Sequence, residues 1–256
     1  MLLERSLRLL AERFSRGVVL KRRLPREFGG TRLYVTPEAR LNLWRHDLRK
    51  CDPALLEIAR EVIKPKDVIW DIGANVGLFA FTASHFAGSA GQVYAFEPDI
   101  TLVQLMRRSA AEVPACNAPV HLVAVAISDH VGLAEFRIAK RRAANSLLVE
   151  PSLVTGGVVE TQIVPVFSID ALLDQLPAPS VVKIDVEAAE NLVFKGAERL
   201  LRDVKPIIIA ETSERNVEWN SQWLAGFGYR FYDADAPKHD RPQLDSMAWN
   251  TLALPR

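Results

Sequence analysis

Four clusters of charged and glycine residues stand where apolar segments of the chain end. The first follows residues 68–70 and reads Asp71-Ile72-Gly73-Ala74-Asn75-Val76-Gly77. Glycine has no Cβ atom, so such a turn between a strand and a helix can bring backbone close to a ligand. Its spacing differs from the G-x-G-x-x-G of dinucleotide-binding turns. Asp71 instead suits a cationic ligand such as S-adenosylmethionine, and a plain strand–turn–helix connection is the alternative.

The second and third clusters have residue types that can contact an adenosine group. Glu97 ends the next apolar segment, 20 residues after Gly77, and an acid there can accept both ribose hydroxyl groups. Glu97 can also interact with the N-terminus of the following helix. Ser128 and Asp129 follow the apolar segment 120–126. Asp129 can accept a hydrogen bond from an adenine amino group or serve as an ordinary turn residue.

The fourth cluster carries alternating charges at the end of a strand. In Val182-Lys183-Ile184-Asp185-Val186-Glu187, strand geometry puts the three charged side chains on one side. Such charges are costly to bury unless they are paired or functional. In open α/β sheets the carboxyl ends of the strands face the ligand crevice. Lys183, Asp185 and Glu187 are therefore candidates for catalysis, and Glu211 can join them from the end of a neighbouring strand.

A regular alternation of strands and helices positions these clusters. Apolar segments without polar alternation, each followed by a helical pattern, are typical of a parallel sheet covered on both faces. The expected strands are residues 68–70, 92–96, 120–126, 181–184, 207–210, 229–232 and 247–252. The expected helices are residues 52–63, 77–86, 100–112, 189–201 and 216–227.

Two regions depart from this alternation. Residues 132–139 and 162–166 alternate like antiparallel strands around the polar segment 140–160, which predicts an inserted hairpin or flap. Residues 2–20 have the apolar spacing of an amphipathic helix.

The composition is that of an ordinary globular protein, with 49% hydrophobic and 25% charged residues in a chain of 256. The net charge of +1 gives no sign of nucleic-acid binding. Residues 1–50, however, carry thirteen Lys or Arg against five Asp or Glu. A solvated helical face is the favoured interpretation of this basic segment, and a surface that contacts an anionic substrate or a membrane is the alternative.

The cysteines and histidines suggest no chemistry of their own. Cys51 and Cys116 have neither metal-ligand nor disulfide spacing. His85 is expected on a helix surface and His121 at the start of a strand, so both are interpreted as structural. No apolar run reaches the roughly 18 residues of a membrane-spanning helix, and charged residues interrupt the apolar start of the chain. We therefore expect a cytoplasmic protein, and the sequence does not indicate its oligomeric state.

Taken together, the clusters resemble the FkbM family of S-adenosylmethionine-dependent methyltransferases. Besides the first cluster, the resemblance rests on Phe96-Glu97-Pro98, on Ala124-Val125-Ala126-Ile127-Ser128-Asp129, on Lys183-Ile184-Asp185-Val186-Glu187-Ala188-Ala189-Glu190, and on residues 164–173 and 250–252. It implies an α/β fold, a class I methyltransferase (Rossmann-like) sheet of seven mostly parallel strands with the last one antiparallel. It also implies a basic N-terminal helical or cap segment (residues 1–65) before an S-adenosylmethionine-binding methyltransferase domain (residues 66–256).

The resemblance implies O-methylation of a hydroxyl group on a sugar, polyketide or other small molecule, with S-adenosylhomocysteine as the second product. The residues implied in cofactor binding are Asp71, Gly73, Asn75, Gly77, Glu97, Ser128 and Asp129. The candidates for catalysis are Asp185, Glu187, Lys183 and Glu211. The family usually has glycine where this chain has Ala188, and a side chain there is expected to shift Glu187.

Three alternatives stay open at this point. Mg²⁺ held by Asp185 and Glu211 is less favoured than a metal-free site, because Lys183 can neutralise the same carboxylates. A cofactor-binding module without catalytic activity, whose basic N-terminus docks a partner, is the second alternative. A nicotinamide-dependent oxidoreductase is the third, and it is disfavoured by Asn75, which stands where the second glycine of a dinucleotide turn belongs.

Overall fold

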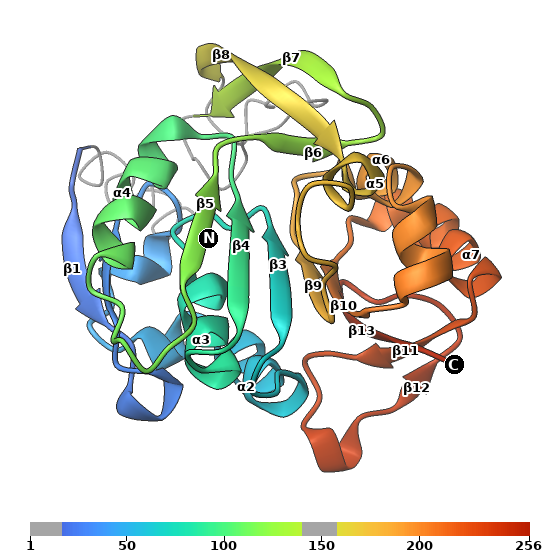
Figure 1. Cartoon of the computed structure of the whole chain (residues 1–256), viewed down its shortest axis with the longest axis horizontal. Helices are drawn as coiled ribbons and strands as arrows, with labels where there is room; N and C mark the ends of the chain where they lie inside the picture. The colour runs from blue at the N-terminus through green and yellow to red at the C-terminus, as the bar shows by residue number, and fades with distance from the viewer. Residues whose placement is uncertain (1–16, 140–157) are drawn as a thin grey trace, which may run out of the picture.

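The computed structural model of the protein describes residues 17–139 and 158–256. Most of the amphipathic helix expected over residues 2–20 and most of the flap expected over residues 140–160 lie outside the described residues. The described part contains a large central sheet, a three-stranded sheet and a two-stranded sheet (Figure 1).

An eight-stranded sheet with helices on both sides forms the centre of the molecule (Figure 1). Its neighbouring strands are, in order, β12 (Gln243–Leu244), β11 (Tyr229–Asp233), β13 (Asn250–Pro255), β10 (Ile207–Glu211), β9 (Val181–Ile184), β3 (Val68–Ile72), β4 (Gln92–Phe96) and β5 (Val120–Val123). The strands from β10 to β5 are parallel, and β13 pairs antiparallel with both β10 and β11. The Rossmann-like α/β fold expected from the sequence is confirmed, and the two-residue β12 adds an eighth strand at the edge.

Each face of the sheet has its own helices and its own apolar core. On one face lie α2 (Pro53–Val62), α3 (Leu78–Ala87) and α4 (Ile100–Ala110), and on the other lie α5 (Ile169–Leu172), α6 (Glu190–Lys195) and α7 (Val217–Gly226). Along β3, Ile69 packs in the first core and Trp70 in the second, because successive strand side chains point to opposite faces. With both faces buried, these strands have the continuous apolar sequences that predicted them.

The N-terminal segment packs into the core that contains α2 and α3. β1 (Leu20–Arg23) and β2 (Arg32–Val35) pair antiparallel, and the short 3₁₀ turns η1 (Arg26–Phe28), η2 (Leu41–Trp44) and η3 (Leu48–Lys50) lead to α2. Phe28, Leu33 and Leu43 are buried in this shared core. The expected N-cap of α2 is confirmed: Asp52 Oδ1 accepts a hydrogen bond of 3.1 Å from the Leu55 amide, and proline occupies the first turn.

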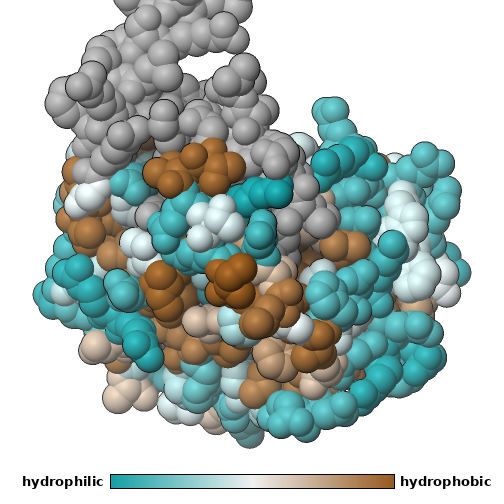
Figure 2. Space-filling model, turned by 90° about the horizontal axis from the view of Figure 1, so that it is seen from above, coloured by the Kyte–Doolittle hydropathy of each residue, from teal (hydrophilic) through white to brown (hydrophobic). Residues whose placement is uncertain are grey.

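The third strand expected from the sequence is divided between two sheets. β5 ends at Val123, and the following β6 (Ala126–Ser128) pairs in parallel with β8 (Val158–Ser168) of the three-stranded sheet. The expected hairpin is confirmed, because β7 (Gly132–Ala139) pairs antiparallel with β8. The side chains of Leu133 in β7 and Ile163 in β8 are exposed on the outer side of this hairpin. From the side where this sheet lies, the surface mixes apolar and polar residues (Figure 2).

The helix expected over residues 189–201 is interrupted at Gly196. α6 ends at Lys195, and a π-helical turn η6 (Leu200–Val204) follows. A Cβ atom on Gly196 would lie 2.2 Å from the carbonyl oxygen of Ser128, so the backbone of this turn packs directly against the end of β6. The remaining 3₁₀ turns are η7 (Glu214–Asn216) and η8 (Lys238–Asp240). No helix in the described part of the chain is long and apolar enough to cross a membrane.

We expect Gly196→Ala to lower the free energy of unfolding by about 3 kcal/mol, because the added methyl group overpacks a contact with rigid backbone. For a chain of this size, each kcal/mol lowers Tm by about 2–4 °C, which calorimetry can measure. Gly226→Ala in α7 is the control: its Cβ meets no atom within 4 Å, so Tm should stay constant or rise. Equal Tm values for the two variants would contradict the close approach at Gly196.

Candidate active site

The register between strands places four charged side chains on one face of the sheet. Asp71 lies beside Lys183 in the β3–β9 pairing, and Lys183 lies beside Ile209 in the β9–β10 pairing. Ile209 packs in the core that contains α2 and α3, so its cross-strand neighbours point to the same face. Glu211 and Asp185 follow two residues after Ile209 and Lys183, and they share this orientation. The acids therefore gather where β9 and β10 end.

The ammonium group of Lys183 is buried between two aspartates. Its Nζ lies 3.1 Å from Asp71 Oδ1 and 3.3 Å from Asp185 Oδ2, and it donates a hydrogen bond of 2.8 Å to the carbonyl oxygen of Gly73. Burial by itself lowers the Lys183 pKa, but the two carboxylates outweigh burial and hold this pKa above its usual range. Burial raises the pKa of Asp71, and Lys183 opposes that rise. The contacts of Lys183 thus favour a positioning role over a catalytic one.

Asp71 does not face an open site. Its side chain is fully buried and lies against Lys183, whereas the sequence predicts contact with a cationic ligand. The side chain of Asp185 is 40% accessible on the other side of the same ammonium group. A ligand charge at this rim therefore meets Asp185 and not Asp71.

The glycines of the turn after β3 are required by the protein's own packing. Gly73 has φ +75°, and a Cβ atom there would lie 1.9 Å from the carbonyl oxygen of Asp185. Gly77 has φ +84°, and its Cβ atom would lie 2.6 Å from the ring of Phe81. The sequence attributes both glycines to a close approach of ligand, but neighbouring residues already account for them. Between them, Asn75 adopts a left-handed conformation with φ 54°.

Glu97 connects the end of β4 to this turn. Its Oε2 accepts a hydrogen bond of 2.9 Å from the Asn75 amide, and its Oε1 accepts one of 2.9 Å from the Asp99 amide. The side chain is buried, and burial raises its pKa to about 8 although both amides lower it. Glu97 lines neither described cavity, so its contact with ribose hydroxyl groups stays a prediction.

A cavity of about 730 Å³, open to solvent, lies beside the turn and the acids. Three parts of the chain line it: the N-terminal segment, the turn with the start of α3, and the ends of β9 and β10. The lining residues are Arg40, Leu43, Leu55, Ala74, Asn75, Val76, Leu78, Phe79, Lys183, Asp185, Glu187 and Glu211.

A smaller cavity of about 400 Å³ adjoins the first and shares Leu55, Lys183, Asp185 and Glu211 with it. Its apolar lining comes largely from α2 and β10, and its polar lining includes three residues that the first cavity lacks. These three are Asp52, Asp235 and Asn250. The two cavities therefore meet at Asp185 and Glu211.

Two carboxyl groups of the larger cavity have pKa values suited to proton transfer near neutral pH. Burial raises the pKa of Glu187 to about 7, and the charges of Asp185, Glu211 and Glu190 add to this effect. Burial raises the pKa of Glu211 to about 7 as well, with Asp185 next in effect and Lys183 and Arg40 opposing. A general base is most effective when its pKa lies near the working pH. The expected cluster of Asp185, Glu187 and Glu211 therefore has the chemistry of a proton acceptor.

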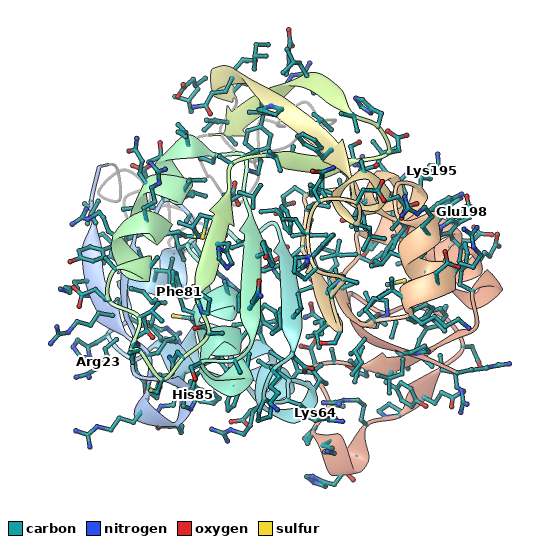
Figure 3. The ribbon with its side chains drawn as sticks, in the orientation of Figure 1. Arg23, Lys64, Phe81, His85, Lys195 and Glu198 are labelled. Carbon is teal, nitrogen blue, oxygen red and sulfur yellow. The ribbon has the colours of Figure 1, made fainter. Side chains whose placement is uncertain are left out.

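Other predicted residues lie apart from the two cavities. Ser128 is buried in β6, and Asp129 Oδ1 lies 2.9 Å from His130 Nδ1; neither residue lines a described cavity. The ring of His121 stacks on Tyr94 at 4.8 Å. His85 extends from α3, and its Nδ1 lies 3.4 Å from Asn117 Oδ1 (Figure 3). These contacts agree with structural roles for both histidines.

The turn at Ala188 has a backbone conformation that is strained for a residue with a side chain. Ala188 has φ 59°, a left-handed conformation that glycine adopts more easily. Its carbonyl oxygen accepts hydrogen bonds from Arg215 Nη2 and Asn216 Nδ2. Buried Glu190 accepts from the Ala188 amide and from the Ser213 hydroxyl group. This network holds the loop that carries Glu187.

The sequence alone did not single out the cavity residues of the N-terminal segment. Arg40, Leu43 and Leu55 lie in no motif, and only the helix cap at Asp52 had a local signal. Asp235, which lines the smaller cavity after β11, likewise lies in no sequence motif.

The described residues contain no group of three or more His, Cys, Asp or Glu arranged to hold a metal ion. Asp185, one of the two ligands considered for Mg²⁺, pairs with Lys183. Mg²⁺ keeps several waters and can be held by two carboxylates, so the preference for a metal-free site stays a prediction.

Comparison with known proteins gives a consistent result. The sequence profile described as "Methyltransferase FkbM domain" matches residues 71–231. The chain is 26% identical over 186 residues to the hexuronic acid methyltransferase AglP of Haloferax volcanii, and the match covers 72% of each chain. Among solved structures, a methyltransferase FkbM from Methylobacillus flagellatus KT has a TM-score of 0.40 at 17% identity, covering 63% of this chain and 40% of that one. A precorrin-6y C5,15-methyltransferase from Geobacter metallireducens GS-15 has a TM-score of 0.44 at 16% identity, covering 78% and 85%.

We expect Lys183→Met to lower the free energy of unfolding by about 3–5 kcal/mol at neutral pH, because it leaves a buried carboxylate without its cation. Burial then keeps the Asp71 pKa above its unfolded value, so protonation relieves the variant at acid pH and its loss of stability grows as pH rises. Denaturant unfolding at acid and neutral pH measures both effects.

The double variant Asp71→Asn with Lys183→Met is the matched control, since it removes the unpaired charge. It should regain part of the lost stability at neutral pH. Equal stability of the single and double variants would show that the ion pair is not what holds β3 against β9.

Proposed function

The chain belongs to the FkbM methyltransferase family, and on this premise we propose that it transfers a methyl group from S-adenosylmethionine to a hydroxyl group of a sugar or similar small molecule. The observation that carries the proposal is the carboxyl group of Glu211, whose pKa of about 7 suits a base and which lines both cavities. A base is needed because a neutral hydroxyl group must lose its proton as it is methylated.

The cofactor is proposed to occupy the larger cavity beside the turn that follows β3. Asn75 and Val76 line that cavity, and Glu97 supports the turn from the end of β4. When bound, S-adenosylmethionine supplies a methyl group already activated by its sulfonium. The protein's own tasks are then to align the two ligands, to exclude water and to accept one proton.

The acceptor is proposed to enter through the smaller cavity, since Asp185 and Glu211 lie between the two cavities. Apolar residues such as Ile58 and Ala234 can pack on the carbon face of a sugar ring, while Asp235 and Asn250 can bond its hydroxyl groups. Glu211 would take up the acceptor's proton as the bond between oxygen and the methyl carbon forms, while the sulfur–methyl bond breaks and S-adenosylhomocysteine leaves.

One similar protein is named for a hexuronic acid, a sugar that offers both hydroxyl and carboxylate oxygens. A carboxylate acceptor is already ionised at neutral pH and needs no base. The raised pKa values of Glu187 and Glu211 support a hydroxyl oxygen as the methylated atom. Dependence of the rate on Glu211 therefore separates the two kinds of acceptor.

We expect S-adenosylhomocysteine to bind with micromolar affinity and NAD not to bind, as measured by isothermal titration calorimetry. Glu97→Ala should abolish the first interaction, because it removes both the expected ribose contact and the support of the Asn75 amide. Glu198→Gln changes an exposed glutamate shortly after α6 that lines neither described cavity, and it should leave binding unchanged (Figure 3). Binding of NAD alone would overturn the proposed cofactor class.

We expect Glu211→Gln to lower kcat by about 10²–10⁴-fold with little change in the affinity for S-adenosylhomocysteine, because the amide cannot accept the acceptor's proton. The wild-type rate should rise with pH through about 7, since Glu211 acts only in its ionised form. Glu187→Gln is the matched comparison and should have the smaller effect. The rates of both variants can be measured by mass spectrometry as methyl transfer to a panel of neutral and acidic sugars. An unchanged kcat in Glu211→Gln would exclude Glu211 as the base.

A further inference from the structure

The hairpin of β1 and β2 turns a row of cations away from the core. In its antiparallel pairing, Lys21 lies opposite Tyr34 and Arg23 lies opposite Arg32. Leu33, between the last two positions of β2, is buried in the core, so these four side chains belong to the outer face of the hairpin. Arg23 is exposed there (Figure 3).

The last turn of α4 extends the same face. The Tyr34 amide donates a hydrogen bond of 2.8 Å to Ser109 Oγ, which places α4 beside the hairpin (Figure 1). The guanidinium carbon of Arg108 lies 4.0 Å from the centre of the Tyr34 ring, and Lys21 Nζ lies 5.0 Å from it. We call this surface the basic face, and its cations are Lys21, Arg23, Arg32 and Arg108.

One acid partly balances the basic face. Glu112 Oε1 lies 2.7 Å from Lys21 Nζ, and its Oε2 lies 3.4 Å from Arg32 Nη1. Arg23 instead donates a hydrogen bond of 2.9 Å to the Gly30 carbonyl oxygen, and no acid contacts it among the described residues. Like charges that lie opposite each other on neighbouring strands repel. The fold therefore holds an excess of positive charge at this surface.

The positive charge is concentrated in the two segments that meet here. Residues 20–35 and 100–118 together contain seven Lys or Arg and two Asp or Glu, whereas the whole chain has a net charge of +1. No cation of the basic face lines either described cavity. The surface thus lies outside the proposed transfer site, and its charge suits an extended anionic partner.

Apolar residues next to the basic face favour a membrane over a nucleic acid as that partner. Val19, directly before β1, is 45% exposed. The sequence before it, residues 2–14, has the apolar spacing of an amphipathic helix. Stable attachment to a membrane needs an apolar contribution in addition to a basic one. Binding to the phosphates of a nucleic acid depends mainly on the cations.

We propose that the basic face is the surface with which the protein docks on the anionic headgroups of a lipid membrane. Each Lys or Arg close to an anionic bilayer strengthens binding about fivefold. Salt screens exposed charges, so this attraction falls as ionic strength rises. The inference goes beyond the proposed function and does not depend on the acceptor or on the role of Glu211.

Co-sedimentation of the full chain with lipid vesicles tests the proposal. We expect binding to vesicles of equal parts phosphatidylcholine and phosphatidylglycerol, little binding to phosphatidylcholine alone, and a decrease as salt is added. Failure to bind the anionic vesicles at low ionic strength would overturn the proposal. Tighter binding to a duplex oligonucleotide than to these vesicles, at the same ionic strength, would also overturn it.

The triple variant Arg23→Gln, Arg32→Gln, Arg108→Gln removes three charges of the basic face and keeps Lys21 paired with Glu112. Its partition onto the anionic vesicles should fall about 10²-fold. The corresponding triple variant with lysine at these positions keeps the charges and should partition like the wild type. An unimpaired glutamine variant would contradict docking through the basic face, and the Tm of each variant shows that it is folded.

The triple variant Lys195→Gln, Arg202→Gln, Arg230→Gln is the matched control, because it changes the net charge equally. These three cations are exposed, and Lys195 lies on the opposite side of the molecule from Arg23 (Figure 3). Partition onto the anionic vesicles should stay within a few-fold of the wild type. An equal loss in the control and in the glutamine variant of the basic face would show an effect of net charge alone and would overturn the proposal.

Discussion

The burial of Lys183 between Asp71 and Asp185 is the constraint on which the rest of the site depends. A charge taken out of water costs several kcal/mol unless close partners compensate for it. Lys183 meets this requirement with two carboxylates and the Gly73 carbonyl oxygen. The same ammonium group thus joins β3, β9 and the turn after β3 into one unit. Gly73 completes the unit, because its missing side chain leaves room for the Asp185 carbonyl oxygen.

The chemistry of the remaining acids follows from this arrangement. Lys183 is occupied by Asp71 and Asp185, so burial dominates the environments of Glu187 and Glu211 and raises both pKa values to about 7. An ordinary glutamate, with a pKa near 4.3, is a weak proton acceptor. A higher pKa makes the carboxylate a better base but reduces its ionised fraction at neutral pH. Nearby positive charge increases the ionised fraction of these carboxyl groups, but it also lowers their pKa and so makes them weaker bases.

Local patterns in the sequence were sufficient to predict the central sheet and the place of its acidic residues. Apolar runs predicted the strands, strand periodicity put Lys183, Asp185 and Glu187 on one side, and Glu211 was expected at the end of a neighbouring strand. The pairing of Lys183 with Asp71 had no local signal in the sequence, because Asp71 lies on another strand, 112 residues earlier in the chain. The division of the third strand into β5 and β6 could not be predicted from local patterns either, since it depends on the pairing of β6 with the distant β8. The contribution of Arg40 had no local signal at all.

The charge of the acceptor also affects the ionisation of Glu211. An anionic group placed beside Glu211 disfavours the ionised carboxylate, raises its pKa further and weakens it as a base at neutral pH. A neutral hydroxyl-bearing sugar leaves the balance between Glu211, Lys183 and Arg40 as it is in the free protein. A sugar acid needs its own cation to avoid this penalty. Among the described residues that line the cavities, the cations are Lys183, which is buried, and Arg40, which pairs with Asp52; a neutral acceptor is therefore the one we expect.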